Sequence, residues 1–224
     1  ANQREVWRAE RGFYSGSGLL STHGNLVFQG DMAGNFKAYT ADTGQEVWSY
    51  PAQGGIMASP IAYKLDGEQY IAIAQGWGGE SSLPFGAISG PLNMFNISRM
   101  LVFKLGATAS LPVIETQVQL LPPHELAMAA PEQVAEGREL YNLYCAVCHG
   151  GNAISGGLLP DLRYRIAELD PDWQAIVYDG VFAGAGMPAW KDYLSREEAD
   201  KIKAYVVHEA RLGSERGERR LVRR

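Results

Sequence analysis

The two cysteines of the chain, Cys145 and Cys148, are three positions apart, and His149 follows the second directly. Thiols at this spacing can each add to one vinyl group of a porphyrin, and the neighbouring imidazole then reaches the iron as an axial ligand. A zinc site would need a second Cys/His pair to complete four ligands, and the chain has no other cysteine. A redox dithiol would need a thioredoxin-like βαβ setting, which does not surround the motif. The motif therefore predicts one covalently attached haem c.

A cytochrome of this kind needs a sixth ligand on the iron. Met187 lies between Gly186 and Pro188, in a loop, whereas a core methionine usually sits on an apolar helix or strand. A thioether ligand stabilises reduced iron, so Met187 predicts a positive potential and one-electron transfer. The other methionines all precede the cysteines: Met32, Met57, Met94, Met100 and Met128. Three further histidines are weaker candidates: His23, His124 and His208.

The segment after the motif contains candidate supporting residues. Pro160-Asp161-Leu162 resembles the cytochrome c segment in which a proline carbonyl accepts a hydrogen bond from Nδ1 of the axial histidine. By this resemblance the carbonyl of Pro160 would fix the His149 ring and tune the iron. Arg163 and Trp190 are candidate donors to the haem propionates.

Two amphipathic segments predict helices around the motif. The first begins at Pro131, has early glutamates and ends at the cysteines, as suits a helix start. The second, 195–210, begins with a capping sequence in which Ser195 is the N-cap and Glu198 is N3. The expected buried stripes are Val134, Leu140, Tyr141 and Tyr144 on the first and Ala199, Ile202, Tyr205 and Val206 on the second. We expect these helices to cross in an all-α, class I-like cytochrome c domain over residues 131–210.

Charge divides the chain, whose formal net charge is −5. Residues 1–110 carry seven Lys/Arg against eight Asp/Glu, residues 111–210 seven against fifteen, and residues 211–224 six against two. The acidic haem region favours a partner of complementary charge and not nucleic acid. The proline-containing segment 107–130 predicts an extended, semi-rigid linker. The basic tail 211–224 is expected to be disordered, with docking on an acidic or phospholipid surface as the alternative.

No run of apolar residues approaches eighteen, so the sequence predicts no transmembrane helix. The first residues are followed by charged and polar side chains and do not form a signal peptide. A haem c is attached on the outer side of an energy-transducing membrane. We therefore expect a bacterial periplasmic protein whose leader is absent from this numbering.

Residues 1–106 consist of short alternating runs separated by turns, which predicts antiparallel β-structure. The ending Glu-Val-Trp occurs twice, and Trp7 and Trp48 are 41 residues apart, the length of a propeller blade. A generic β-sandwich is the alternative. The period and the turn pattern favour a propeller.

The segment from Ala38 to Trp48, with Thr43-Gly44 in its turn, resembles the tryptophan-docking motif of quinoprotein alcohol dehydrogenases. These are eight-bladed propellers that hold pyrroloquinoline quinone (PQQ). Thr40 departs from the Asp usual in the motif. Residues 66–72, followed by the glycine loop 76–79, are similar to the last blade of that family. With the haem segment added, the whole chain resembles the C-terminal part of the quinohaemoprotein alcohol dehydrogenases.

The resemblance implies about two blades of the propeller, namely a complete blade over residues 17–52 and three strands of another over 57–106. In the family a strand from the N-terminus closes the last blade, and the vicinal disulfide, calcium ligands and catalytic aspartate lie in earlier blades. We therefore expect a fragment, or one piece of a divided enzyme, whose partner is the rest of the propeller. PQQ and Ca²⁺ are implied for the complete enzyme. Gly78 and Gly79 would lie near the quinone, or else form only a tight turn.

The resemblance implies no catalytic residue in this chain and an electron-transfer role. Electrons would pass from reduced PQQ through the haem to an external acceptor such as a blue-copper protein, another cytochrome or a quinone-reducing subunit. The alternative is a free-standing mono-haem cytochrome c whose β-segment serves as a docking adaptor.

Overall fold

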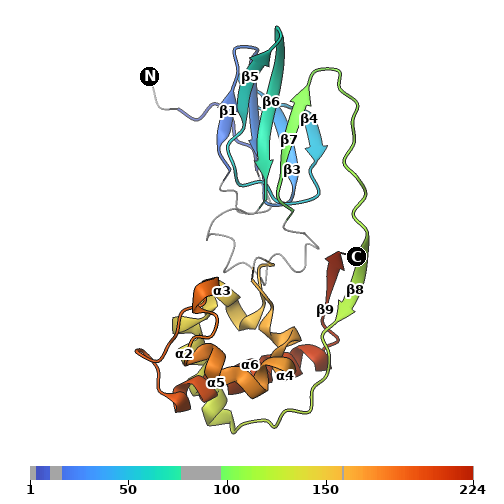
Figure 1. The fold of residues 1–224 in the computed structure, drawn as a ribbon. Helices are drawn as coiled ribbons and strands as arrows, with labels where there is room; N and C mark the ends of the chain where they lie inside the picture. Colours follow the sequence, from blue (N-terminus) through green and yellow to red (C-terminus); the bar gives the residue numbers. More distant parts are fainter. Residues whose placement is uncertain (1–3, 11–16, 77–96, 158, 224) are drawn as a thin grey trace. The chain divides into compact units, whose positions relative to one another are not determined.

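The computed structural model describes residues 4–10, 17–76, 97–157 and 159–223. The chain forms two compact units: the described residues up to 114 make a β unit, and those from 115 onward make a largely helical unit. Figure 1 shows strands β1 to β7 in the first unit, and helices α2 to α6 with strands β8 and β9 in the second. The expected order of β-structure followed by helices is confirmed.

The β unit holds two antiparallel sheets whose strands follow one another in sequence order. The first sheet has the order β1-β2-β3-β4 and the second the order β5-β6-β7. Their bounds are β1 Leu19–Ser21, β2 Leu26–Gly30, β3 Asn35–Thr40, β4 Glu46–Pro51, β5 Ile61–Leu65, β6 Glu68–Gln75 and β7 Arg99–Lys104. These sheets match the four-stranded blade expected over 17–52 and the three strands expected over 57–106.

Trp7 docks on the turn between β3 and β4. Its indole Nε1 donates a hydrogen bond of 2.8 Å to the carbonyl of Ala41. The ring lies so close to Gly44 that a Cβ there would be 2.5 Å from the ring carbons. Gly44 also has a φ of +71°, a conformation that side-chain-bearing residues rarely adopt. The turn therefore requires glycine both for its backbone and for the approach of Trp7, as expected of a tryptophan-docking motif.

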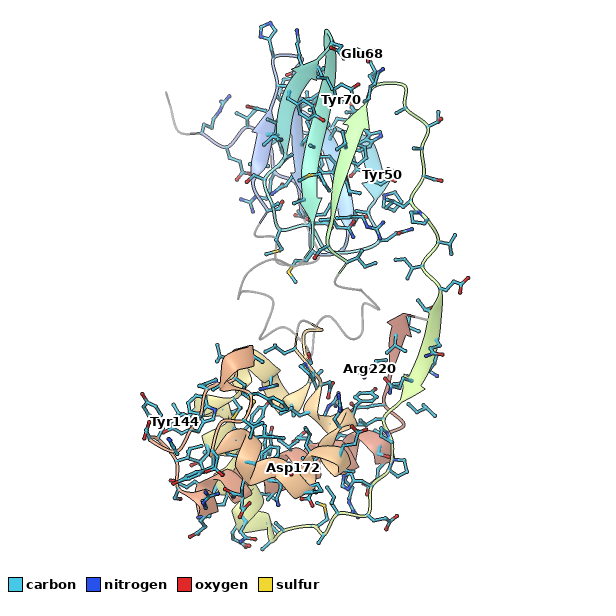
Figure 2. The ribbon with its side chains drawn as sticks, viewed as in Figure 1. Tyr50, Glu68, Tyr70, Tyr144, Asp172 and Arg220 are labelled. Atoms are coloured by element: carbon cyan, nitrogen blue, oxygen red, sulfur yellow. The ribbon has the colours of Figure 1, made fainter. Side chains whose placement is uncertain are left out.

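Aromatic side chains join the two sheets into one apolar core. Phe103 on β7 lies against Phe36 on β3 at 5.3 Å between ring centroids, and against Trp48 on β4 at 5.2 Å. Tyr50, labelled in Figure 2, meets the same Phe103 ring at 4.9 Å. Each such aromatic pair contributes about 0.5–1.5 kcal/mol beyond the burial of its area. The fully or nearly fully buried members of this core are Phe36, Ala52, Ile56, Ile71, Ile73 and Leu101.

The helical unit is built on its two longest helices. The α-helices are α2 Pro131–Tyr144, α3 Ala146–His149, α4 Ile166–Leu169, α5 Trp173–Val177 and α6 Arg196–Glu215. Short 3₁₀ turns lie between them: η2 Gly151–Ala153, η3 Leu162–Tyr164, η4 Asp170–Asp172 and η5 Ala183–Ala185. The start of α6 has the expected capping box, in which Ser195 and Glu198 exchange hydrogen bonds with each other's backbone. None of the described helices combines the length and the apolar character needed to cross a bilayer.

The expected apolar stripes of α2 and α6 face one core. The rings of Tyr141 and Tyr205 lie 5.2 Å apart, and both side chains are fully or nearly fully buried. Trp173 of α5 donates a hydrogen bond of 2.8 Å from Nε1 to the carbonyl of Ala199 on α6. The other stripe residues of α2 pack at the edge of this core and are only partly buried: Val134, Leu140 and Tyr144.

The tail forms regular structure as far as Arg223, so the expectation of a disordered tail over 211–224 is wrong for the described residues. Helix α6 continues to Glu215, and strand β9, Arg219–Arg223, pairs antiparallel with strand β8, Thr116–Leu120 (Figure 1). Strand β8 lies inside the segment expected to be an extended linker, so part of that linker belongs to the helical unit. Two arginines of the tail have partners in the helical unit, since Arg211 donates to the carbonyl of Leu126 at 3.0 Å and Arg220 to Oε1 of Gln119 at 2.9 Å. Arg220, labelled in Figure 2, lies 3.9 Å from the ring centre of Tyr164.

Candidate haem site

The predicted attachment motif lies on a single helical turn. Cys145 ends α2, where its N–H donates to the carbonyl of Tyr141 at 2.8 Å, and it also precedes α3. The N–H groups of Cys148 and His149 donate to the Cys145 carbonyl at 3.1 and 2.9 Å. Both cysteines are free thiols and half-buried. The turn brings two free thiols and an imidazole close together, which is the set of groups that haem c attachment requires.

Electrostatics do not favour a thiol-redox site. Burial, with a smaller contribution from Cys148, raises the pKa of Cys145 to about 12. Redox dithiols need the opposite shift, because the thiolate is the nucleophile. In the part of the chain that the structure describes, no group of three or more His, Cys, Asp or Glu side chains is arranged to hold a metal ion. Neither the dithiol nor the zinc alternative gains support.

His149 has the character of a neutral ligand. Burial lowers the pKa of its imidazole, and the Pro160 backbone and the charge of Asp161 act in the opposite direction. Its Nδ1 atom is buried and has no hydrogen-bond partner of regular geometry among the described residues. The Pro160 backbone nevertheless acts on the imidazole as a hydrogen-bond partner, which agrees with the expected contact between Nδ1 and this carbonyl. With Nδ1 directed into the protein, Nε2 is the nitrogen left to bind iron.

Two tyrosines hold the loop that follows His149, a role that their apolar spacing did not reveal. The hydroxyl of Tyr141 donates to the carbonyl of Gly150 at 2.9 Å, and that of Tyr205 donates to Oδ1 of Asn152 at 3.4 Å. Burial raises the pKa of both, that of Tyr205 to about 12, so both hydroxyls remain protonated donors. Tyrosine in place of leucine in an otherwise apolar stripe was the available signal, since a buried hydroxyl needs a partner.

Met187 packs on the same core as the motif. It follows the 3₁₀ turn η5 and Gly186, which adopts a left-handed φ of +96°, and its N–H donates to the carbonyl of Phe182 at 3.2 Å. The side chain is half-buried and contacts the helical core, as does Cys145. Thiols, a neutral imidazole and a thioether thus share one small apolar unit. This donor set fits a haem c with a Met/His-ligated iron.

The two candidate propionate donors differ in their surroundings. Arg163 is 6 % exposed and is already paired with two carboxylates, Asp161 at 2.9 Å and Glu218 at 2.6 Å. We therefore revise the expectation for Arg163, because its charge is balanced inside the protein. Trp190 is half-buried, with its ring 5.3 Å from that of Tyr144.

The remaining candidates lie away from the motif or outside the described residues. Gly78 and Gly79, expected near PQQ, are outside the described residues. Gly76, just before them, donates from its N–H to the carbonyl of Gly55 at 2.9 Å. His124 is 3.3 Å from the carbonyl of Val207 through Nε2, which ties it to α6.

Two family models match separate parts of the chain. Residues 2–71 match the β-propeller domain of glucose, ethanol and alcohol dehydrogenases. Residues 132–206 match subunit III of cbb3-type cytochrome c oxidase. The second match contains the complete attachment motif and Met187.

Similar proteins span both parts. Quinohemoprotein alcohol dehydrogenase ADH IIB of Pseudomonas putida is 43% identical over 208 residues, covering 92% of this chain and 30% of its own length. The solved structure of ADHIIG from Pseudomonas putida HK5 aligns with a TM-score of 0.73 and 39% identity, over 86% of this chain and 28% of that one. The enzyme from Comamonas testosteroni aligns with a TM-score of 0.61 and 30% identity over the same shares.

The fold and the site therefore define the class of protein. The chain consists of antiparallel sheets from a PQQ propeller, followed by a helical cytochrome c domain. The chain is homologous to the quinohaemoprotein, PQQ-dependent alcohol dehydrogenases and corresponds to their C-terminal portion. It spans about 30% of the length of these relatives. The alternative of a free-standing cytochrome with a docking adaptor gains no support, because the relatives contain both parts within one longer chain.

Proposed function

We propose that this chain binds one haem c covalently through Cys145 and Cys148, with His149 and Met187 as the axial ligands of the iron. The proposal is supported by the one-turn motif with free thiols, and by the packing of Met187 and Cys145 on one apolar core. When bound, the haem supplies one-electron oxidation and reduction. The residues of the chain hold the ligands and limit the access of water to them. An apolar, thioether-containing environment favours reduced iron.

We infer further that the chain is the electron-transfer portion of a PQQ-dependent alcohol dehydrogenase. Support comes from relatives described as quinohemoprotein alcohol dehydrogenases. Electrons from reduced PQQ would pass through the haem to a blue-copper protein, another cytochrome or a quinone-reducing subunit. Residues 111–210, with seven Lys/Arg against fifteen Asp/Glu, favour an acceptor that has a complementary basic surface.

The rest of the propeller is the expected partner of the β unit. Among the described strands, β5 and β7 each have only one neighbour, and apolar side chains on them are exposed: Ile61, Leu65, Met100 and Val102. Unpaired edges and exposed apolar side chains are typical of a surface that another segment covers. That remainder would supply most ligands of PQQ and Ca²⁺, with Gly78 and Gly79 contributed by this chain. Because haem c is attached on the outer side of an energy-transducing membrane, the proposed haem implies a bacterial periplasmic protein.

The observation that carries the proposal is the pair of thiols and the imidazole on one helical turn. Intact-mass analysis of protein matured in a periplasm should show a gain of one haem, and alkaline pyridine should give a c-type haemochrome spectrum. The double variant Cys145→Ala/Cys148→Ala should lose both signals after denaturation, because no thioether bond retains the porphyrin. Colourless wild-type protein with two titratable thiols would overturn the proposal.

A further inference from the structure

We propose that Glu218, the residue directly before strand β9, is a positioning residue of the haem site. Through Arg163 it holds the Pro160-Asp161 segment that lies beside His149. This inference rests on the haem attachment proposed above. It adds to that site a residue 69 positions beyond His149 in the sequence.

The backbone of Glu218 is fixed on both sides. Its N–H donates to the carbonyl of Gly213 at 2.9 Å, and its carbonyl accepts from the N–H of Leu121 at 2.8 Å. The second bond continues the β8–β9 ladder, in which Leu120 pairs with Arg219. Because both hydrogen bonds hold the main chain of Glu218, they fix the position from which its side chain extends into the protein.

That side chain ends on a buried cation. Arg163 donates from Nη1 to Glu218 at 2.6 Å, and from Nε and Nη2 to the two oxygens of Asp161 at 3.1 and 2.9 Å. The guanidinium and the Asp161 carboxylate are 6% and 7% exposed, and the Glu218 carboxylate is 33% exposed. Two carboxylates thus share one guanidinium in a largely water-free place, where charge-assisted hydrogen bonds are strong. The Arg163, Asp161 and Glu218 side chains together carry a net charge of −1, and the exposed Arg216 lies 4.0 Å from the other oxygen of Glu218.

The same group acts on His149, the proposed axial ligand, through the neighbouring backbone and through charge. Asp161 is joined by its peptide bond to Pro160, whose backbone lies against the His149 ring, and its charge acts on that ring. Asp161 is also the N-cap of η3, accepting from the N–H of Arg163 at 3.1 Å. A displacement of Arg163 would therefore move Asp161, and with it the Pro160 backbone beside His149.

The charge of this group has a direct consequence for the iron. Oxidation of the haem adds one positive charge, which a nearby net negative charge stabilises. Glu218→Gln would leave a neutral Arg163–Asp161 pair, so oxidised haem would lose stabilisation and the reduction potential would rise. The loss of the 2.6 Å contact would also loosen the turn that Asp161 caps.

The test compares Glu218→Gln with Glu215→Gln in the haem-bearing chain. Glu215 is exposed at the last residue of α6, so its replacement changes the charge equally without touching Arg163. The first readout is the reduction potential from spectroelectrochemical titration. The second is the hydrogen-exchange rate of the Arg163 and Tyr164 amides, which bond to Asp161 at 3.1 and 3.3 Å.

We expect Glu218→Gln to raise the potential and to speed exchange of both amides severalfold, and Glu215→Gln to change neither. Equal shifts in the two variants, or none in Glu218→Gln, would overturn the inference. Should Glu218→Gln fail to fold, Glu218→Asp keeps the charge and shortens the reach. It should speed exchange with little change in potential, and unchanged exchange would count against positioning. Absence of haem from wild-type protein would sink the proposed function, whereas the exchange comparison would still test the positioning role.

Discussion

Gly137 of α2 lies directly against the backbone carbonyl of Lys201 on α6. A Cβ built at Gly137 would be 1.9 Å from that oxygen, far inside van der Waals contact. The neighbouring atom is main chain and cannot rotate aside. The absence of a side chain at this one position therefore lets the two helices approach, and Tyr141, one turn further along α2, meets Tyr205 in the core.

Replacement of Gly137 by alanine should destabilise the helical unit. Helix propensity favours alanine by about 1 kcal/mol, but overpacking against a backbone atom costs about 1–3 kcal/mol and forces the helices apart. We expect a net loss of stability in urea denaturation followed by circular dichroism. Gly184→Ala is the matched control, because nothing lies within 4 Å of a Cβ there. A Gly137→Ala protein as stable as wild type would contradict the close crossing.

Substitution of Met187 by alanine should remove the sixth ligand of the proposed haem. The far-red charge-transfer band of oxidised iron–thioether ligation should disappear, and the reduction potential should fall, because a thioether stabilises the reduced state. Met100→Ala is the control, since Met100 is 63% exposed on β7 of the β unit. Retention of the band in Met187→Ala would assign the sixth position to another residue.

The haem-free chain should lose stability on mild acidification. Burial lowers the pKa of His149 below its ordinary value of 6.5, so the unfolded chain takes up the proton more readily than the folded one. The stability linked to the neutral ring is complete above about pH 6.5 and is lost as the pH falls toward the lowered folded pKa. Urea midpoints of protein made without haem maturation, measured between about pH 8 and about pH 5, should show this decline. In the His149→Gln variant this part of the dependence of the urea midpoint on pH should be absent. A pH dependence equal to that of the wild type would mean that other groups cause the effect.

Truncation of the chain after Glu218 should release strand β8. The ladder that joins Thr116–Leu120 to Arg219–Arg223 would be lost, while the Arg163–Glu218 ion pair could still form. We expect hydrogen exchange to become fast for the amides of 116–120 and to stay slow in α2. Arg219→Ser, an exposed change inside the intact strand, is the control. Unchanged protection of 116–120 after truncation would show that β8 does not depend on the tail.

The sequence by itself determined the features that depend on neighbouring residues. Cys145, Cys148 and His149 occupy one helical turn because spacing along the chain fixes their geometry there. The capping box at Ser195 and the left-handed turn at Gly44 are equally local, since each is set by the hydrogen bonds or backbone angles of a few residues. For this reason the order of the β and helical units and the attachment motif could both be predicted.

Only the tertiary structure decided which distant segments meet. Arg163 was expected to serve a propionate and instead pairs with Glu218, 55 positions away, and a tail expected to be disordered became strand β9 against β8. The sequence shows how many charged arginines the tail contains, but it does not show which residues they contact after folding. The burial that lowers the pKa of His149 is likewise a property of the folded chain. Pairings of this kind depend on the positions that distant segments take once the helices have packed. No local sequence pattern encodes those positions.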